Sequence, residues 1–512
     1  MAFSPDGEFL MIGNSNSQIR FLDPDTLKDV QNPCKTSERN AKAYIHDITV
    51  ANDSKHMATI DNDNCVSLFK REHKFNDPSQ PIEWIFTGKC RSHEIAITSL
   101  AFGESLDEED KVKLRLFSIG MDRRLFEYDV AKSSEQNGLI VVNMLQIEQE
   151  SRPTACIWCP KTDFQPSLLT VNDEYKIKIW NVSRSGSRKT CLGPTYGGEI
   201  VRLRNLNIAG SHDNFLAYAT REKVIGLMKL PVDGNPNKTM GLIAHPNRVV
   251  DLCVSSDGRY VFTCGGEDLA VNMWSVDVTP IENAIAMGGE GIEPFINLIE
   301  GGREGQTYQD MQDFFYYSMI RSKVENTTKT RKLDGTVPLK ELPNLMRAMG
   351  YYPTQKEIEN MKDEVRFSNF TSTGQYEESV NLDTFTRLFV NHRPVYPIGK
   401  NNIESTFAAL VGDRKATLNK DDLLNFLQRE GEKMTVKDLE ECLHLLVGDS
   451  NFKTALPPEF TAEDFFQNIL SFEEVEELEE DEEEALAEEP GFDRGAYQLE
   501  GAIPEEENKS NY

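Results

Sequence analysis

The sequence of 512 residues lacks an apolar run long enough to cross a membrane, and we predict neither a membrane-spanning helix nor a signal peptide. Its nine cysteines lack the spacing of a disulfide framework, which indicates a reducing compartment. Basic residues are also scarce, because 55 Lys and Arg stand against 84 Asp and Glu, for a net charge of −29. We therefore expect neither a nucleic acid nor a membrane as the main partner. The length allows two or three domains.

What the sequence does contain is a repeated pattern of short strands. In the clearest copy, residues 245–277, apolar and polar residues alternate in short runs that are separated by Gly and Asp turns, as in β-hairpins. Each copy is marked by an acidic or amide residue that is followed six positions later by a large apolar or aromatic residue. The marker pairs are Asn16/Leu22, Asp63/Phe69, Asp122/Tyr128, Glu174/Trp180, Glu222/Met228 and Asp268/Trp274.

The second residues of these pairs lie 47, 59, 52, 48 and 46 positions apart. Four short strands at such a spacing are typical of β-propeller blades, so we predict about six blade-like repeats in residues 1–277. Residues 1–7 read as the end of a first strand. We therefore expect an incomplete first blade in a fragment or short isoform of a longer protein, and the pattern leaves open whether the propeller closes without upstream residues.

The repeats resemble those of the WD-repeat family, whose blades link a His, a Ser or Thr, an Asp and a Trp by hydrogen bonds. Three repeats keep versions of this set. The resemblance implies a structural network in each of them, made of His46, Thr59 and Asp63, of His93, Ser118 and Asp122, and of His245, Thr263, Asp268 and Trp274.

A His, a Ser and an Asp also make up a catalytic triad, which is the alternative interpretation. A triad needs an exposed hydroxyl beside donors for an oxyanion, whereas this set recurs at the same blade position, as a buried network would. We predict no catalytic residue, no cofactor and no enzymatic activity. Cys156 and Cys159 form a CxxC pair on a predicted strand, where they face opposite sides, so we interpret them as ordinary strand cysteines.

From residue 278 onward the pattern changes. Six glycines between positions 288 and 305 predict a Gly-rich linker over residues 278–305, with one helical turn at most. Apolar residues at helical spacing follow in residues 306–472, and a capping box at residues 354–357 begins one of the helices. Eight helices in pairs predict four helix–loop–helix units. We predict that residues 473–512 form a disordered acidic tail; the alternative is a contact for a basic surface.

Residues 349–361 and 431–435 resemble the segments beside the EF-hand loops of calmodulin and its relatives. The resemblance implies an all-α, calmodulin-like domain over residues 306–472. A calcium loop needs oxygen ligands at fixed positions and a central glycine, and all four loops depart from this pattern. We predict no metal site; the first loop, which keeps Asp334 and Glu341, is only a weak calcium candidate.

If no metal switches these helix pairs, they can still serve as a docking surface. Methionines adapt to irregular apolar partners, so those at helical spacing could line a groove for a partner helix, and the alternative is that they belong to the core. The methionines in question are Met311, Met319, Met346, Met349, Met361 and Met434.

The order of the segments is more specific than any one of them. A WD propeller, a Gly-rich linker, a calmodulin-like domain with altered loops and an acidic tail together resemble the C-terminal part of ciliary WD-repeat proteins of the calmodulin- and spoke-associated complex. The resemblance implies a scaffold subunit at the radial spoke base of the axoneme, which supports spoke assembly and dynein-driven motility of cilia and sperm flagella.

The same resemblance implies as partners the other subunits of that complex, calmodulin (directly or indirectly), and radial spoke and doublet microtubule proteins. The alternative is a cytosolic WD-repeat adaptor, such as a ubiquitin-ligase substrate receptor. A calcium-regulated sensor is a further alternative, but it would need intact loops.

Overall fold

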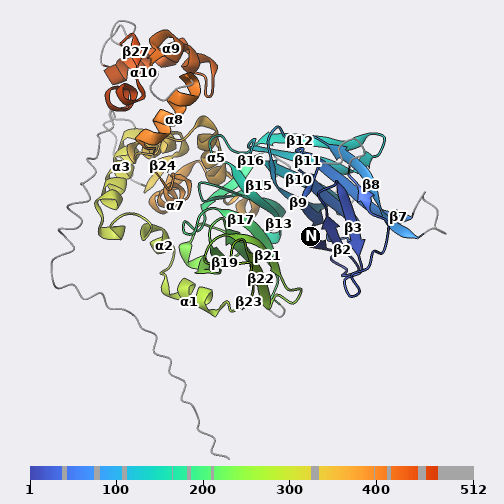
Figure 1. The fold of residues 1–512 in the computed structure, drawn as a ribbon. Helices are drawn as coiled ribbons and strands as arrows, with labels where there is room; N and C mark the ends of the chain where they lie inside the picture. Colours follow the sequence, from blue (N-terminus) through green and yellow to red (C-terminus); the bar gives the residue numbers. More distant parts are fainter. Residues whose placement is uncertain are drawn as a thin grey trace, which may run out of the picture. The chain divides into compact units, whose positions relative to one another are not determined.

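The computed structural model describes residues 1–36, 43–73, 81–106, 112–163, 165–181, 186–208, 213–323, 334–396, 398–411, 417–447 and 457–470 (Figure 1). The chain divides into two compact units, Met1–Pro397 and Ile398–Tyr512. The predicted tail, residues 473–512, lies outside the described residues, as do residues 330–333 at the beginning of the first predicted calcium loop. No helix within the described ranges is both long and apolar enough to cross a membrane.

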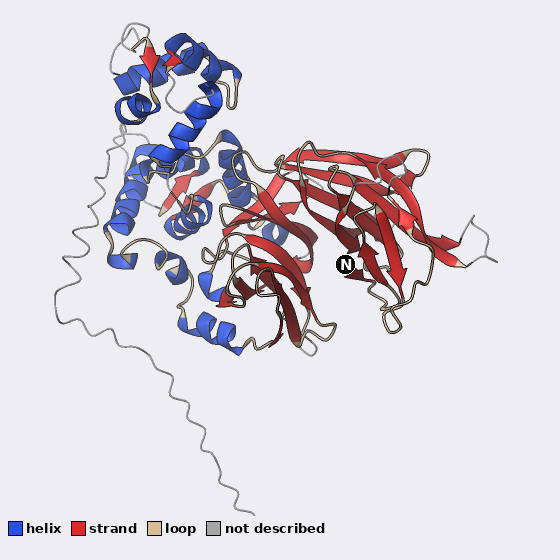
Figure 2. Cartoon of the chain, in the orientation of Figure 1, coloured by secondary structure: helices blue, strands red, loops and turns tan. Residues whose placement is uncertain are grey.

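Six antiparallel sheets form a β-propeller, whose strands are red in Figure 2. In every blade the strands pair in chain order. The first three blades contain β1 (Ala2–Phe3), β2 (Leu10–Gly13), β3 (Gln18–Leu22) and β4 (Cys34–Lys35); β5 (Ile45–Val50), β6 (His56–Asp61), β7 (Val66–His73) and β8 (Ile82–Cys90); and β9 (Ile97–Leu106), β10 (Val112–Gly120), β11 (Arg124–Ser134) and β12 (Gly138–Gln146).

The last three blades contain β13 (Pro153–Asp163), β14 (Gln165–Asn172), β15 (Lys176–Asn181) and β16 (Gly186–Leu192); β17 (Ile200–Leu206), β18 (Phe215–Thr220), β19 (Val224–Lys229) and β20 (Thr239–Ile243); and β21 (Val249–Val254), β22 (Tyr260–Gly265) and β23 (Val271–Ser275). The sixth sheet has three strands and the other five have four each. The predicted fold class, a propeller followed by helices, is confirmed.

Apolar clusters between neighbouring blades hold the propeller together. The second residue of each of the first five marker pairs is at most 5% exposed, and Trp274 of the sixth pair is half-buried. Between the first two blades, Phe21 stacks on Trp84 with ring centroids 6.0 Å apart. Because side chains alternate between the two faces of a strand, each blade can bury one apolar row against each neighbour.

Residues 278–305, which we predicted as a linker, are instead packed at both ends. Helix α1 (Thr279–Met287) buries Ile281 in a cluster with Leu206 and Phe215 of the fifth blade. The short helix α2 (Glu293–Ile296) joins the core of the helices that follow, and a 3-10 turn, η3 (Gly302–Glu304), completes the segment. The glycines adopt the turns between these pieces, as at Gly301, whose φ is +73°.

The first helical lobe, called lobe 1 here, covers residues 292–396. It contains α3 (Gln306–Ser322), β24 (Thr336–Pro338), η4 (Leu339–Glu341), α4 (Leu342–Ala348), α5 (Gln355–Arg366), α6 (Phe370–Thr373), β25 (Ser379–Asn381) and α7 (Leu382–His392). The predicted capping box is confirmed, because Thr354 Oγ1 accepts from the Glu357 amide and the Glu357 carboxylate accepts from the Thr354 amide.

The second lobe, lobe 2, covers residues 398–470 and has its own apolar core. It contains α8 (Lys400–Val411), β26 (Leu418–Asn419), α9 (Lys420–Arg429), α10 (Val436–Val447), β27 (Glu459–Phe460), α12 (Ala462–Asp464) and the helical turn η5 (Phe465–Ile469). We predicted residues 306–472 as one domain, whereas the compact units divide between Pro397 and Ile398. In each lobe a short antiparallel strand pair joins two helix–loop–helix units, β24 with β25 and β26 with β27.

Candidate functional site: blade networks and helical lobes

In the third blade the predicted polar residues meet in one buried network. Nδ1 of His93 lies 2.9 Å from Oδ1 of Asp122, and its Nε2 lies 2.7 Å from Oγ of Ser118. Oγ of Ser118 also lies 2.8 Å from the hydroxyl of Tyr128. Burial lowers the pKa of His93, while the neighbouring Asp122 acts in the opposite direction. The network therefore joins the segment before β9 to β10, β11 and the turn between them.

The position of Ser118 decides between a structural and a catalytic interpretation of this network. An attacking hydroxyl has to reach a substrate carbonyl, with donors for the oxyanion nearby. Ser118 is 0% exposed and shares its hydrogen bonds with two side chains of its own blade. The arrangement favours a brace between strands.

The sixth blade repeats the arrangement with a threonine and a tryptophan. Nδ1 of His245 lies 2.7 Å from Oδ2 of Asp268, and its Nε2 lies 2.9 Å from Oγ1 of Thr263. The indole of Trp274 donates to the same Thr263 oxygen at 3.0 Å. A Cβ atom on Gly265 would lie 1.7 Å from the Asp268 carboxylate, so the close approach of this turn requires glycine.

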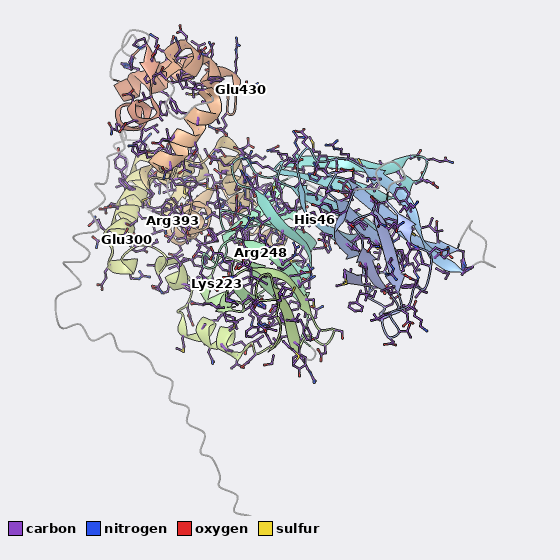
Figure 3. The ribbon with its side chains drawn as sticks, in the orientation of Figure 1. His46, Lys223, Arg248, Glu300, Arg393 and Glu430 are labelled. Atoms are coloured by element: carbon purple, nitrogen blue, oxygen red, sulfur yellow. The ribbon has the colours of Figure 1, made fainter. Side chains whose placement is uncertain are left out.

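The second blade differs from the prediction that His46, Thr59 and Asp63 form a network of this kind. The His46 side chain, labelled in Figure 3, is exposed on β5, whereas Thr59 is 1% exposed. The turn is held instead by Asp61, whose Oδ1 accepts from the amides of Asp63 and Cys65 at 3.0 and 3.1 Å. A carboxylate two positions earlier thus holds this turn.

The fourth blade contains a buried polar cluster that the sequence analysis missed. The Glu148 carboxylate accepts from Lys178 Nζ at 2.6 Å and from Ser151 Oγ at 2.8 Å. Asn172 Nδ2 donates to Ser151 Oγ at 2.9 Å. This blade has no histidine in its sequence; the signal that the sequence offered was Lys178 within the largely buried strand β15.

The CxxC cysteines occupy opposite faces of β13, as predicted. Cys156 belongs to the apolar cluster between the third and fourth blades, and Cys159 to the cluster between the fourth and fifth. Burial raises the pKa of each thiol to about 12. Both cysteines remain thiols at neutral pH, which disfavours a redox or metal-binding role.

The two weak calcium candidates of the first helix–loop–helix unit, Asp334 and Glu341, have different side-chain partners. The Asp334 carboxylate lies 2.7 Å from Nζ of Lys323, and this contact lowers the pKa of Asp334 to about 2. Glu341 accepts from Asn344 Nδ2 at 3.2 Å. The Asp334 carboxylate is thus paired with an ammonium group, which opposes a divalent cation beside it. No cluster of three His, Cys, Asp or Glu side chains suited to a metal occurs among the described residues.

In lobe 1 the methionines that could have lined a groove lie in the apolar core. Met311 and Met361 are 0% exposed, and they share one apolar cluster with Phe295 of α2. Met319 and Met346 belong to the same cluster, and Met349 packs against it. In lobe 2, Met434 is half-buried at the edge of the core. The interpretation as core holds for the methionines of lobe 1.

Lobe 1 is fixed to the fourth blade by a buried lysine. Lys176 Nζ donates to the carbonyl oxygens of Asn391 at 2.8 Å and of Arg393 at 2.6 Å, at the end of α7. The Asn391 side chain accepts from the Leu192 amide of β16 at 3.0 Å. Burial lowers the pKa of Lys176 to about 7. A neutral amine still has two N–H groups, one for each carbonyl.

Comparisons with known proteins agree with both halves of this architecture. Residues 306–470 match the family model described as CFAP251 C-terminal domain, and residues 234–275 match the model described as WD domain, G-beta repeat. The chain is 41% identical over 526 residues to Cilia- and flagella-associated protein 251 of Tetrahymena thermophila, covering 94% of this chain and 52% of the relative. It is 34% identical to the protein of that name from Mus musculus, covering 92% of this chain and 37% of the relative.

A shorter similarity concerns a different protein. Over 110 residues, or 22% of this chain, it is 26% identical to Dynein regulatory complex protein 8 of Mus musculus, covering 65% of that relative. The chain spans about half the length, or less, of the two longer relatives.

Proposed function

This chain is homologous to cilia- and flagella-associated protein 251 over more than nine tenths of its length, and on that premise we propose that it is a scaffold subunit of an axonemal complex at the radial spoke base. There it supports spoke assembly and the regulation of dynein-driven motility in cilia and sperm flagella. The observation that carries the proposal is the homology across both the propeller and the helical lobes. The predicted ciliary localisation agrees with the printed name of the relatives.

The geometry supports a scaffold without a chemical step. The His, Ser, Thr and Asp side chains that could have formed a triad are used to hold strands together in the third and sixth blades. Lys176 couples the propeller to lobe 1, so the two present a fixed combined surface to partners. A rigid body of this kind suits a subunit that sets the spacing between other proteins.

The proposed partners are the other subunits of the calmodulin- and spoke-associated complex, calmodulin itself, and radial spoke and doublet microtubule proteins. The similarity to a protein named as part of the dynein regulatory complex supports a setting among axonemal complexes. The paired helix–loop–helix lobes are a form of helical domain that binds segments of other proteins.

The test is deletion of the endogenous protein in a ciliated cell, followed by return of the full chain with a fluorescent tag. We expect the tag along the axoneme, and cryo-electron tomography should show a radial spoke that is absent in the deletion and restored with the chain. Beat frequency should recover in parallel. Diffuse cytosolic fluorescence, with ubiquitin-ligase subunits recovered on the tagged chain, would instead support the cytosolic adaptor.

The matched control is Ser118→Ala, which removes the buried hydroxyl of the third-blade network and no exposed group. At equal protein level this variant should restore spokes and beating as the unaltered chain does. Restored spokes with a paralysed axoneme would indicate that Ser118 performs chemistry, and would contradict the non-enzymatic assignment.

A further inference from the structure

The sixth blade ends on β23, which no other described strand covers. Its sheet consists of β21, β22 and β23 in that order, whereas each of the other five sheets has a fourth strand outside its third (Figure 1). The Gly265 amide donates to the Ala270 carbonyl, which therefore points toward β22. Because the direction of the backbone groups alternates along an antiparallel strand, those of Val271 and Met273 point to the free edge.

The free edge also lacks the features that usually keep an edge strand from pairing with another chain. Prolines and charged side chains commonly protect such edges, and β23 has neither, with the sequence VNMWS. Val271 and Met273 are 73% and 63% exposed. In the fifth blade the corresponding Ile225 is 5% exposed, because the sixth blade packs against it. An uncharged edge strand with exposed apolar side chains is a template for a further strand.

A cavity of about 150 Å³ lies beside this edge, between the fifth and sixth blades. Trp274 of β23 is half-buried, and Leu242 of β20 is 39% exposed. An apolar cavity of about this size holds a benzene ring, so the side chain of a phenylalanine fits it. Its apolar walls include Leu227, Met240, Leu242, Val261, Trp274 and Pro280.

Two other blades show what their fourth strands contribute at such a place. In the second blade, Trp84 of β8 is 2% exposed and stacks on Phe21 of the first blade. In the third blade, Leu139 of β12 is 4% exposed in a cluster with Leu68 of the second blade. Each fourth strand thus packs a large apolar side chain against the preceding blade. The sixth blade has the cavity on this side and no fourth strand.

We propose that the free edge of β23 binds an extended segment of a partner protein as a fourth strand, antiparallel to β23, with a phenylalanine or a similarly large apolar residue opposite Trp274. Residues paired across two strands share one face of the sheet, so this side chain enters the cavity on the side of the fifth blade. The residue opposite Met273 lies on the other face, where an uncharged β-branched side chain covers the exposed methionine.

Two kinds of contact therefore select the partner. Main-chain hydrogen bonds to Val271 and Met273 require an extended segment, and the cavity selects its large apolar residue. The proposal deepens the scaffold function, and rests on it for the setting in which the partner is met.

Hydrogen exchange of the full chain supplies the readout. The probe is a short synthetic peptide with a central phenylalanine, valines on the opposite face of the strand, threonines elsewhere and one lysine at each end. At ten times the Kd we expect the amides of Val271 and Met273 to exchange about tenfold more slowly, because mass action leaves about one site in eleven free. A ligand that only filled the cavity would leave these amides unprotected.

Two proline variants test the strand pairing. Met273→Pro removes an amide that points to the free edge and no bond to β22, and it should weaken binding at least about tenfold. Met144→Pro is the matched control, because Met144 lies on β12, the edge strand of the third blade, and is 52% exposed. Its amide also points away from the neighbouring strand, since the Ile147 amide points toward it. This control should bind the peptide as the unaltered chain does.

Two aspartate variants test the cavity. Leu242→Asp places a charge in the apolar wall and should weaken binding at least about tenfold. Ile243→Asp changes the next residue of β20, which is 67% exposed and faces the other side of the strand, and should leave binding unchanged. A peptide with alanine in place of phenylalanine should bind the unaltered chain at least about tenfold more weakly, which tests the cavity without any variant having to fold.

Equal binding of the alanine peptide, unchanged binding in Met273→Pro, or an equal loss in Ile243→Asp and Leu242→Asp would overturn the proposal. Protection of β23 that increases with the concentration of the chain alone would also overturn it, in favour of a second copy pairing edge to edge. These outcomes are independent of localisation, so a chain that binds the peptide but is absent from axonemes refutes the proposed function and leaves this site in place.

Discussion

The buried carboxylate of the third blade should contribute strongly to stability. In Asp122→Ala, His93 Nδ1 loses a partner at 2.9 Å, and the amides of Glu94 and Arg124 lose contacts of 3.3 Å each. The Asp122 side chain is 4% exposed, so water has little access to replace it. A buried polar group left without a partner costs about 1–3 kcal/mol, and the long amide contacts add less, so we expect a loss of about 2–4 kcal/mol.

The sixth blade offers a matched comparison. Asp268→Ala removes the equivalent contact to His245 at 2.7 Å and one amide contact, from Ala270 at 3.3 Å. The Asp268 side chain is 19% exposed, so water can take over part of its role. We expect this substitution to destabilise its blade less than Asp122→Ala does.

The assay is native-state hydrogen exchange read by mass spectrometry, because a chain with two compact units does not unfold in one step. A loss of 2–4 kcal/mol corresponds to exchange about 30 to 1,000 times faster. In Asp122→Ala the faster exchange should appear in peptides of β9, β10 and β11. In Asp268→Ala it should appear in β21, β22 and β23, to a smaller extent.

An unchanged exchange rate in the third blade of Asp122→Ala would refute the reasoning. So would a larger effect from Asp268→Ala, since the burial of the two carboxylates predicts the reverse order.

Three further substitutions test other parts of the structure. Burial lowers the pKa of Lys176 to about 7 from 10.5, so between these pH values the unfolded chain binds a proton that the folded chain has released. The free energy of unfolding should therefore rise with pH across this window, by at most about 1.4 kcal/mol per pH unit. In Lys176→Met, urea unfolding should show a smaller rise of this free energy with pH. Phe295→Ala should destabilise lobe 1 by about 3–5 kcal/mol, seen as faster exchange in α3 and α7 with lobe 2 unaffected. Lys323→Ala should return the pKa of Asp334 from about 2 toward 3.8 in a carboxyl NMR titration.

The propeller could be predicted from the sequence because its signal is repeated. Each strand needs apolar residues at alternate positions to pack against the next blade, and six copies of one marker pair reveal that need even where single copies are degenerate. Leu22, Phe69 and Met228 carry no polar group, yet they are buried like Tyr128. Every repeat keeps a large apolar or aromatic side chain at this position, whereas only some of these side chains can form a hydrogen bond.

The polar networks could be predicted only in part, because several residues can satisfy the same turn. His93 and His245 were placed with their partners, whereas the second blade uses Asp61, two positions before the predicted Asp63. The fourth blade satisfies a buried lysine, Lys178, with a glutamate. A pattern that specifies residue types cannot find a network that meets the same requirement with other groups.

The glycines of residues 278–305 do not distinguish a flexible linker from a packed segment. Glycine occurs in flexible connections, but it also permits the positive φ between packed helices, as at Gly291 and Gly301 on either side of α2. The sequence signal that distinguishes the two is the helical spacing of the apolar residues between Gly291 and Gly301, which are buried in lobe 1. At the other end of the segment, Ile281 is buried against the fifth blade. A segment that is anchored at both ends transmits the orientation of the propeller to lobe 1. The Lys176 contact fixes the same orientation at a second point, so loosening either one alone should leave the other to hold the two parts together.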